Sequence, residues 1–360
     1  MAYSSITKPT DYFNTNLWTG TGDSTTAVTG VGFQPDWVWV KNRDVGDDHM
    51  LFDAVRGVTK RLFSNSTGAE GTDAQTLTSF DSDGFTTGNN RATGGDSGNK
   101  MVAWNWLAAN GTASNSNGSI TSTVSANTTA GFSIVSWTGT GDGTPSSSGT
   151  LGHGLSSAPK MIIVKNRTDA ANWPVYHAGN TSAPETEVIY LNLTNTTSDD
   201  NNFWNDTAPT SSVFTVAGDN SVNGNGDSMI AYCFADVKGY SKFGNYVANA
   251  NTNGPFVYTG FKPAWVLVKN NDVAQGWYLL DNKRDTSNQV QKSLAPHNSS
   301  TENDSSANNG CDFLSNGFKV RAVGTGDINH TSGNNYIYMA FAENPFVGND
   351  SGTAVPVVAR

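Results

Sequence analysis

The chain has 360 residues, of which 14% are charged and 11% aromatic, and its formal net charge is −10. This acidity and the lack of Lys/Arg clusters exclude nucleic-acid binding through phosphates, and no apolar run is long enough for a membrane-spanning helix. Residues 1–8 lack the apolar core of a signal peptide, so we expect synthesis in a cytoplasm. Abundant glycine and regularly placed aromatic residues are typical of an all-β protein with many loops.

One motif occurs three times and organises the chain. Four large apolar residues run up to a Lys-Asn pair at residues 35–42 (PDWVWVKN), 159–166 (PKMIIVKN) and 263–270 (PAWVLVKN). Such a run predicts a short, buried strand, which we term the signature strand. The proline lies at the start of the strand, where its missing N–H costs least. The strand ends at the Lys-Asn pair, and a loop follows. Three copies in the same context indicate an internal repeat.

The segments around each signature strand also correspond. An aromatic residue opens each repeat (Trp18, Trp137 and Tyr246), and a second predicted strand follows the signature strand at 50–53, 173–177 and 277–281. Asp83-Gly84 and Asn316-Gly317 are strong turn signals before a later strand. Each repeat closes on an aromatic strand in which large and small residues partly alternate, as on a sheet with one face on a core. These closing strands are 101–106, 229–234 and 336–341.

We therefore predict an all-β fold of three tandem antiparallel β-sandwich repeats of jelly-roll-like form. Asn, Ser, Thr and Gly dominate the expected linker, in which Ile120 and Val124 are the only sizeable apolar residues. Two cysteines, Cys233 and Cys311, are too few for a disulfide framework, and Cys233 is expected in the core. The predicted order is an N-terminal lead-in (1–15), repeat 1 (16–107), a polar linker (108–130), repeat 2 (131–240), repeat 3 (241–345) and a C-terminal tail (346–360).

Metal-binding residues are hard to find in this sequence. Asp81-Ser82-Asp83-Gly84 is similar to the opening of a calcium loop but lacks the bidentate Glu, so a plain Asp-Gly turn is the main interpretation. Calcium at Asp81 and Asp83 is the alternative, and no other cofactor is expected. A second acidic group, Asp44, Asp47 and Asp48 with His49, is also dense enough for a cation, although it lacks regular ligand spacing.

Catalytic residues are equally few. The five histidines form no paired motif, so a solvated loop position is the default for each of them. Glu185 and Glu187 share one face at the start of a predicted strand, and a solvated strand edge is favoured over the acid pair of a glycosidase. The histidines are His49, His153, His177, His297 and His330.

Aromatic residues flanked by Asn and Asp are a better lead. β-Sandwiches bind sugars by stacking aromatic rings on the sugar and hydrogen-bonding its hydroxyls. The candidate glycan-binding residues are Trp173, Trp204, Trp277 and Tyr278. Core packing competes with this interpretation: it is favoured somewhat at Trp173 and Trp277 and is evenly balanced at Trp204. For Trp18 and Trp137, the core is the main expectation.

Five motifs carry a resemblance to known proteins, at residues 18–23, 32–42, 232–246, 254–266 and 338–346. They resemble a family of virion-associated proteins of marine tailed bacteriophages. The resemblance covers most of the chain and implies a location in the virion rather than a particular chemistry. Members are usually labelled tail fibre, structural or hypothetical protein, and no catalytic residue carries over.

We therefore expect a non-enzymatic structural protein of a phage virion, most simply a tail-fibre or spike subunit. It would form a homo-oligomer, with a trimer favoured, contact other virion proteins and attach to host-surface glycans through many weak contacts. A capsid-decorating protein of the head-fibre or cement type is the alternative. A glycan depolymerase is a second alternative, opposed by the absence of a parallel β-helix pattern and of a distinct acid pair.

Overall fold

Repeat 1 folds into two antiparallel sheets in a computed structural model that describes residues 4–322 and 328–345. Its main sheet has the strand order β1-β9-β3-β4-β5-β6, and its outer sheet has the order β2-β8-β7. Short 3₁₀ turns η1 (Pro9–Asp11) and η2 (Arg91–Thr93) accompany them. The strands are β1 (Phe13–Thr19), β2 (Thr25–Thr29), β3 (Trp37–Asn42), β4 (Met50–Asp53), β5 (Lys60–Phe63), β6 (Gly71–Thr72), β7 (Leu77–Asp81), β8 (Gly84–Gly88) and β9 (Lys100–Trp106).

Repeat 2 has a larger main sheet, β10-β11-β12-β19-β14-β15-β16-β17, and a two-stranded outer sheet, β13-β18. Its short helical segments are η3 (Pro145–Ser147), η4 (Pro184–Thr186), α1 (Asn201–Trp204) and α2 (Asn220–Asn223). The strands are β10 (Ala113–Asn115), β11 (Ser122–Asn127), β12 (Phe132–Thr138), β13 (Gly149–Gly152), β14 (Met161–Asn166), β15 (Pro174–His177), β16 (Glu187–Tyr190), β17 (Ser198–Asp199), β18 (Val213–Val216) and β19 (Ser228–Phe234).

Repeat 3 has the main sheet β20-β28-β22-β23, the outer sheet β21-β27-β26 and a small pair, β24-β25. A single helical turn, α3 (Ser306–Asn309), precedes β26. The strands are β20 (Ser241–Val247), β21 (Phe256–Tyr258), β22 (Phe261–Asn270), β23 (Trp277–Asp281), β24 (Lys292–Ser293), β25 (Asn303–Asp304), β26 (Cys311–Leu314), β27 (Gly317–Val320) and β28 (Asn335–Pro345).

The central part of each main sheet has the same strand order. An opening strand, the closing strand, the signature strand and the second strand lie side by side as β1-β9-β3-β4, β12-β19-β14-β15 and β20-β28-β22-β23. All pairings are antiparallel. The all-β, sandwich-like class predicted from the sequence is therefore confirmed, and the signature and closing strands lie where the sequence predicts them.

The signature strands are apolar without interruption because both of their faces are buried. Trp37 and Trp39 of β3 point to the centre of the molecule, whereas Val38 and Val40 point to the outer sheet of repeat 1. The side chains of β14 and β22 divide in the same way between a central cluster and a cluster inside their own repeat. Strands that are buried on both faces carry near-continuous hydrophobic runs, which explains the motif.

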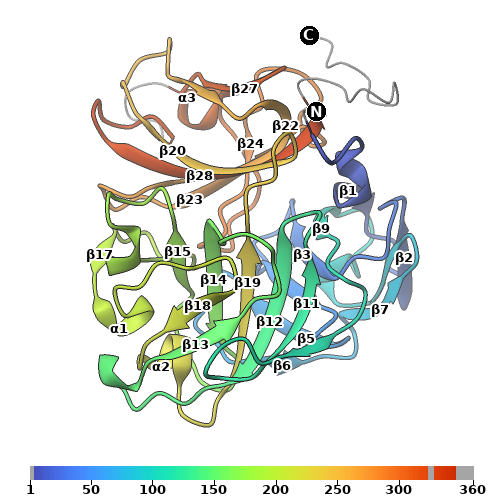
Figure 1. Cartoon of the computed structure of the whole chain (residues 1–360). Helices are drawn as coiled ribbons and strands as arrows, with labels where there is room; N and C mark the ends of the chain where they lie inside the picture. Colours follow the sequence, from blue (N-terminus) through green and yellow to red (C-terminus); the bar gives the residue numbers. More distant parts are fainter. Residues whose placement is uncertain (1–3, 323–327, 346–360) are drawn as a thin grey trace.

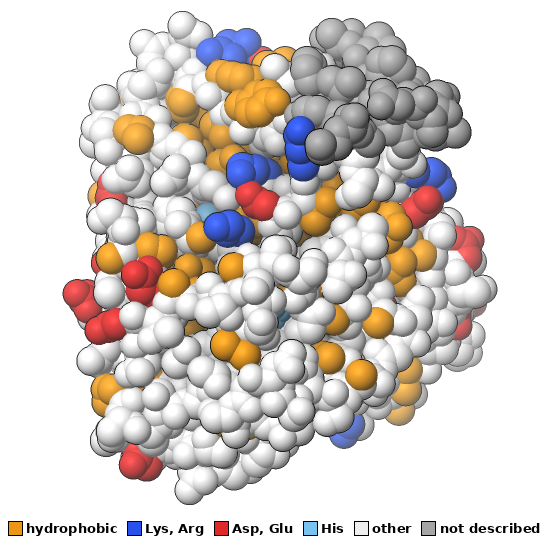
Figure 2. Space-filling model, in the orientation of Figure 1, with side chains coloured by type: hydrophobic (Ala, Val, Ile, Leu, Met, Phe, Trp, Pro, Cys, Tyr) orange, Lys and Arg blue, Asp and Glu red, His pale blue; other side chains and the backbone are white. Residues whose placement is uncertain are grey.

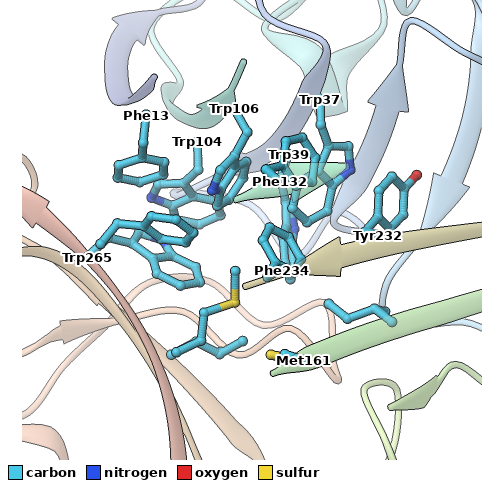
Figure 3. Packing of buried hydrophobic residues seen from close by; sticks show 14 of the residues in the cluster. Phe13, Trp37, Trp39, Trp104, Trp106, Phe132, Met161, Tyr232, Phe234 and Trp265 are labelled. Carbon is cyan, nitrogen blue, oxygen red and sulfur yellow. The ribbon is translucent and has the colours of Figure 1, made fainter. Parts of the chain in front are cut away.

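The three main sheets enclose one shared core. Figure 1 shows the sheet of repeat 3 above the strands of the other two repeats, and the central cluster takes residues from all three. Ring centroids lie 4.4 Å apart between Trp37 and Tyr232, and 4.9 Å apart between Phe13 and Phe341. Tryptophans from β3, β9 and β22 converge at this point (Figure 3). The repeats are therefore joined through aromatic contacts and are not independent domains.

The prediction of a polar linker at 108–130 is wrong. Strands β10 and β11 lie in this segment and extend the main sheet of repeat 2, since β11 pairs with β12 and β10 pairs with β11. Backbone hydrogen bonds form a ladder whatever the side chains are, so Ser and Thr suit a strand with one exposed face. Residue Ile120 also forms a parallel bridge with Leu151 of β13. The segment is thus part of the fold.

Other expectations concern the termini, the cysteines and the membrane. Both cysteines, Cys233 and Cys311, are buried and free. The described part of the N-terminal lead-in begins at Ser4 and contains η1. The predicted C-terminal tail, 346–360, lies outside the described residues. Within the described ranges, no helix is both long and apolar enough to cross a membrane.

We expect the chain to unfold in one cooperative step. The central cluster draws on all three repeats, so no repeat can lose its structure without exposing the aromatic residues of the other two. Differential scanning calorimetry should show a single peak whose van't Hoff enthalpy equals its calorimetric enthalpy. Two or three separable peaks would mean that the repeats behave as independent domains.

Candidate functional site

Three of the predicted glycan-binding residues are buried. The exposed fractions of Trp173, Trp204 and Trp277 are 0%, 2% and 1%. Each indole N–H donates to a main-chain carbonyl: Trp173 to Phe63 and Ser66, Trp204 to Glu187, and Trp277 to Tyr190. The prediction that these tryptophans contact a glycan is therefore wrong, because they fill the core and join segments distant in sequence.

Tyr278, the fourth candidate, is partly exposed on β23. Its ring packs edge-on against His297 at a centroid distance of 6.2 Å. The two tryptophans that open repeats 1 and 2 follow the core expectation. Trp137 is buried, and Trp18 is partly buried against the core of repeat 1. Sequence reasoning thus separated core from surface poorly, because core and surface aromatics share the same polar flanks.

The predicted calcium residues take part in turn contacts. The Asp83 carboxylate accepts hydrogen bonds from the backbone N–H groups of Gly30 (3.0 Å) and Gly32 (2.7 Å). Asp81 accepts one from the Thr86 hydroxyl at 2.7 Å. These contacts fit the Asp-Gly turn interpretation. Over residues 4–322 and 328–345, no group of three or more His, Cys, Asp or Glu side chains is arranged to hold a metal ion.

The second acidic group is also divided among other partners. Asp47 pairs with Arg91, Asp48 accepts from the Asn65 amide, and Asp44 accepts from the backbone of Lys100. His49 is fully buried, and its Nδ1 accepts from the Trp39 indole at 3.0 Å. Each of these side chains therefore binds a different partner, and together they stabilise the loop after β3.

The expectation of solvated histidines is wrong for His49, His153 and His177, which are buried. Burial lowers the pKa of His177 to about 4. Perturbed pKa values often mark functional sites, but structural networks perturb them too. Several buried titratable groups, His177 among them, lie where two repeats meet, and we term these contact zones seams.

Two of the three seams contain charged networks. At the seam of repeats 1 and 2, Arg56 pairs with Asp53 and Glu70, and Glu70 also binds Arg167 of repeat 2 through two contacts of 2.9 and 3.0 Å. The Tyr232 hydroxyl of repeat 2 donates to Asp53 at 2.8 Å. All groups of this network are thus paired, and it joins the repeats rather than forming a reactive centre.

The seam of repeats 3 and 1 repeats this network. Arg284 pairs with Asp281 and Glu302, and Glu302 receives two 2.8 Å hydrogen bonds from Arg43 of repeat 1. The Trp104 indole of repeat 1 donates to Asp281 at 3.1 Å, in the position of Tyr232 at the first seam. The spacing from Asp to Arg is three residues in both seams.

The seam of repeats 2 and 3 has uncharged groups at the positions that hold the Asp and Arg of the other two seams. His177 and Asn180 replace the Asp and Arg, and Asn271 of repeat 3 donates to Asn180 Oδ1 at 3.1 Å. Asn180 in turn donates to Thr197 at 2.6 Å. His177 Nε2 lies 3.0 Å from the Tyr338 carbonyl oxygen, where a proton on Nε2 completes the hydrogen bond. A neutral imidazole suits this acceptor.

Each signature strand ends on a buried lysine, which sequence reasoning assigned only to the start of a loop. Lys41, Lys165 and Lys269 are 0% exposed. Burial lowers the pKa of Lys41 and of Lys165 to about 8 and that of Lys269 to about 7. Each ammonium donates to two carbonyl oxygens: Lys41 to Asn42 and Val45, Lys165 to Thr67 and Ala171, and Lys269 to Thr194 and Asn270.

The outer sheet of repeat 3 presents exposed aromatic residues. Phe256 and Tyr258 of the edge strand β21 are 46% and 56% exposed, while Val257 between them is buried. Residues two apart on a strand share a face and have Cα atoms about 7 Å apart, so both rings lie on the outward side. We call this surface the aromatic face.

Two rows of side chains cross the aromatic face. Phe256 pairs with Lys319, which pairs with Asp312, and this row is charged. Tyr258 pairs with Gly317, which pairs with Leu314. A side chain at Gly317 would collide with the backbone of β21, since a Cβ there would lie 2.0 Å from the Val257 carbonyl oxygen. Arg321 forms an ion pair with Asp312 at 2.6 Å beside the charged row. The face thus combines exposed rings with fixed polar groups.

The corresponding faces of the other repeats differ. In repeat 1, Ala27 and Thr29 of β2 occupy the places of Phe256 and Tyr258, opposite Thr86 and Gly84. In repeat 2, Thr150 of β13 is covered by the segment that includes Ser119, whose backbone N–H donates to the Thr150 hydroxyl at 2.9 Å. The aromatic pair is therefore peculiar to repeat 3, and the fold does not require it.

Alignment of the repeats is the signal that could have found this face. Phe256 and Tyr258 lie a few residues before the signature strand of repeat 3. Repeats 1 and 2 have small residues at the corresponding positions. Figure 2 shows one face of the molecule, on which charged side chains are few and scattered and hydrophobic side chains lie in small groups. Against such a surface, two exposed rings on one strand are a distinctive feature.

A family model described as a domain of unknown function (DUF7483) matches residues 8–345. The match spans all three repeats in one piece, in agreement with their shared core. No curated protein and no solved structure matches the chain.

Proposed function

This chain belongs to the DUF7483 family, and we propose that it is a structural protein of a bacteriophage virion that attaches to host-surface glycans through the aromatic face. The observation that carries the binding part of the proposal is the exposed pair Phe256 and Tyr258 on one side of an edge strand. The virion part is supported by the motifs that resemble phage structural proteins.

The chemistry of the aromatic face suits carbohydrate. Sugar rings present C–H groups that pack on aromatic rings, while their hydroxyls need fixed donors and acceptors. Lys319, Asp312 and Arg321 supply such groups beside the rings, and their positions are fixed because Lys319 also donates to the Gly254 carbonyl at 2.8 Å and Arg321 pairs with Asp312. A short oligosaccharide can lie along β21 and contact both rings.

Binding without catalysis is favoured by the positions of the acidic groups. Of the buried carboxylates, Asp53 and Asp281 pair with arginines inside the seams, and Asp36 accepts from the backbone N–H groups of Ala108 and Asn110. A single shallow face gives weak affinity, so attachment would depend on several copies acting together. A homo-trimeric fibre or spike subunit would meet this need, and we propose that assembly for the protein.

Exchange of the two aromatic residues for those of repeat 1 tests the binding proposal. We expect the Phe256→Ala/Tyr258→Thr double variant to lose about 10-fold or more in affinity for the glycans that the wild type binds, because about 1.4 kcal/mol of stacking would be lost. The residues Ala27 and Thr29 occupy the same backbone positions in repeat 1, so the fold should be kept. A glycan array followed by titration calorimetry provides the measurement.

Val247→Ala is the matched control, because Val247 is 53% exposed on another strand of the same repeat. Its glycan affinity should equal that of the wild type. Equal affinity of the double variant and the wild type would show that the aromatic face is not the binding site.

Labelling of intact particles tests the virion proposal. An antibody against repeat 3 should label the tail of the particle if the protein is a fibre or spike subunit. Even labelling of the head would instead favour the capsid-decorating alternative, and its next test is capsid stability without the protein. Absence of label from particles would overturn the virion assignment.

A further inference from the structure

A separate cavity of about 410 Å³ lies in repeat 3. It is formed by the loop 282–290, which follows β23, together with the start of β22, the end of β28 and β26. Phe313 and Val290 give it an apolar lining, and the charged side chains of Lys262, Lys283 and Glu343 also line it. A cavity of this size suits a small organic ligand.

Most polar groups of the cavity are already paired. Lys262 and Glu343 form an ion pair at 2.5 Å. Asp285 accepts from the backbone N–H groups of Gln291 and Lys292 and lies 3.3 Å from the Lys292 ammonium. Asn288 exchanges two hydrogen bonds with the backbone of Phe313, at 2.9 and 3.1 Å. These contacts fix the walls and leave them little capacity for a further ligand.

Two groups at the start of the loop differ from the rest. Asn282 Oδ1 is buried and has no hydrogen-bond partner among the residues that the structure describes. Lys283 is exposed, and within the same residues its ammonium has no ion pair or hydrogen bond. Native proteins satisfy nearly all buried polar atoms, so an unpaired acceptor on a residue that lines a cavity indicates a missing donor. The unpaired ammonium in turn favours an anion.

The fold does not need these two side chains. Asn282 and Lys283 correspond to Ala54 and Val55 in repeat 1 and to Ala178 and Gly179 in repeat 2. All three repeats share one backbone hydrogen bond at this position. The N–H group donates to a carbonyl oxygen at the start of the signature strand at 2.8 to 2.9 Å, from Ala54, Ala178 and Asn282. Repeat 3 alone places an amide and an ammonium at this point.

We propose that this cavity binds an acidic sugar. The sugar carboxylate would pair with Lys283, a hydroxyl would donate to Asn282 Oδ1, and the C–H face of the ring would pack on the apolar lining at Phe313 and Val290. This site is distinct from the aromatic face and does not depend on it. A free monosaccharide is sufficient to test it, so the result is independent of the function proposed above.

Titration of the full-length protein with glucuronate, glucose, acetate and inorganic phosphate, followed by ligand-observed NMR, tests this proposal. Glucuronate should bind about 10-fold more tightly than glucose and acetate, because only glucuronate supplies both the carboxylate and the hydroxyls. Lys283→Gln should reduce glucuronate affinity to that of glucose. Tighter binding of phosphate than of glucuronate would overturn the assignment to a sugar and indicate a simple anion site.

Two further variants keep the test decisive. Asn282→Ala/Lys283→Val installs the residues of repeat 1 and should abolish glucuronate binding without lowering the melting temperature. Lys100→Gln removes an exposed lysine at the start of β9, distant in sequence from the cavity, and should leave binding unchanged. Unchanged glucuronate affinity in Lys283→Gln, or no glucuronate binding by the wild type, would overturn the proposal.

Discussion

The Asp53→Ala variant is expected to lose about 3–5 kcal/mol of unfolding free energy, the range measured when one partner of a buried ion pair is removed. Asp53 and Arg56 have side chains that are 0% exposed. The substitution leaves the Arg56 guanidinium buried with Glu70 as its remaining acidic partner, and it removes the acceptor of the Tyr232 hydroxyl. Chemical denaturation followed by tryptophan fluorescence measures the loss.

Asp281→Ala should have a loss of similar size, because Asp281 has the same role at the seam of repeats 3 and 1. Asp11→Ala is the control, since Asp11 and Lys8 form an exposed ion pair. Such exposed pairs contribute about 1 kcal/mol or less to the free energy of unfolding. A loss below about 1 kcal/mol for both seam variants would show that the charged seams contribute little to stability.

The second large effect is an increase in stability as the pH rises from about 7 to 9.5. Burial lowers the pKa of Lys41 and Lys165 to about 8 and that of Lys269 to about 7, against 10.5 for an exposed lysine. Between these values the unfolded chain binds more protons than the folded chain, and stability therefore rises with pH. Below pH 7 the lysines are protonated in both states, and their burial cost is present in full.

Between the folded and unfolded pKa values, the free energy of unfolding can rise by about 1.4 kcal/mol per pH unit for each lysine. Guanidinium unfolding at pH 7, 8 and 9.5 measures it. Lys269→Met lacks the lysine with the lowest pKa and should show a smaller rise over the same range. Stability that is flat or falls between pH 7 and 9.5 would show that the three lysines are charged in the folded protein throughout.

The sequence was most informative where burial is regular. The signature and closing strands could be predicted because their side chains are sandwiched between two cores, which forces long apolar runs such as 37–40. Their common strand order follows from the same repetition. The segment 108–130 could not be recognised as part of a sheet, because backbone hydrogen bonds hold its strands. Such bonds form with almost any side chain, so the sequence does not reveal them.

The candidate site was harder to predict, for a related reason. Trp173 and Trp277 have the polar neighbours in sequence that are typical of sugar-binding residues, yet they are core residues whose indole N–H groups donate to carbonyls of the preceding repeat. The packing of the three sheets determines which aromatic residues remain exposed. A local sequence pattern cannot predict this packing. Phe256 and Tyr258 became evident only once the three outer sheets could be compared position by position.

The shared core has a consequence for synthesis on the ribosome. Trp37, Trp39, Trp104 and Trp106 belong to repeat 1, but the partners that cover them include Phe234 of repeat 2 and Trp265 and Phe341 of repeat 3. A nascent chain must therefore carry its most hydrophobic surface uncovered until nearly all of its residues have been translated. Such surface attracts chaperones and other nascent chains, so we expect production of this protein in the cell to depend on chaperones.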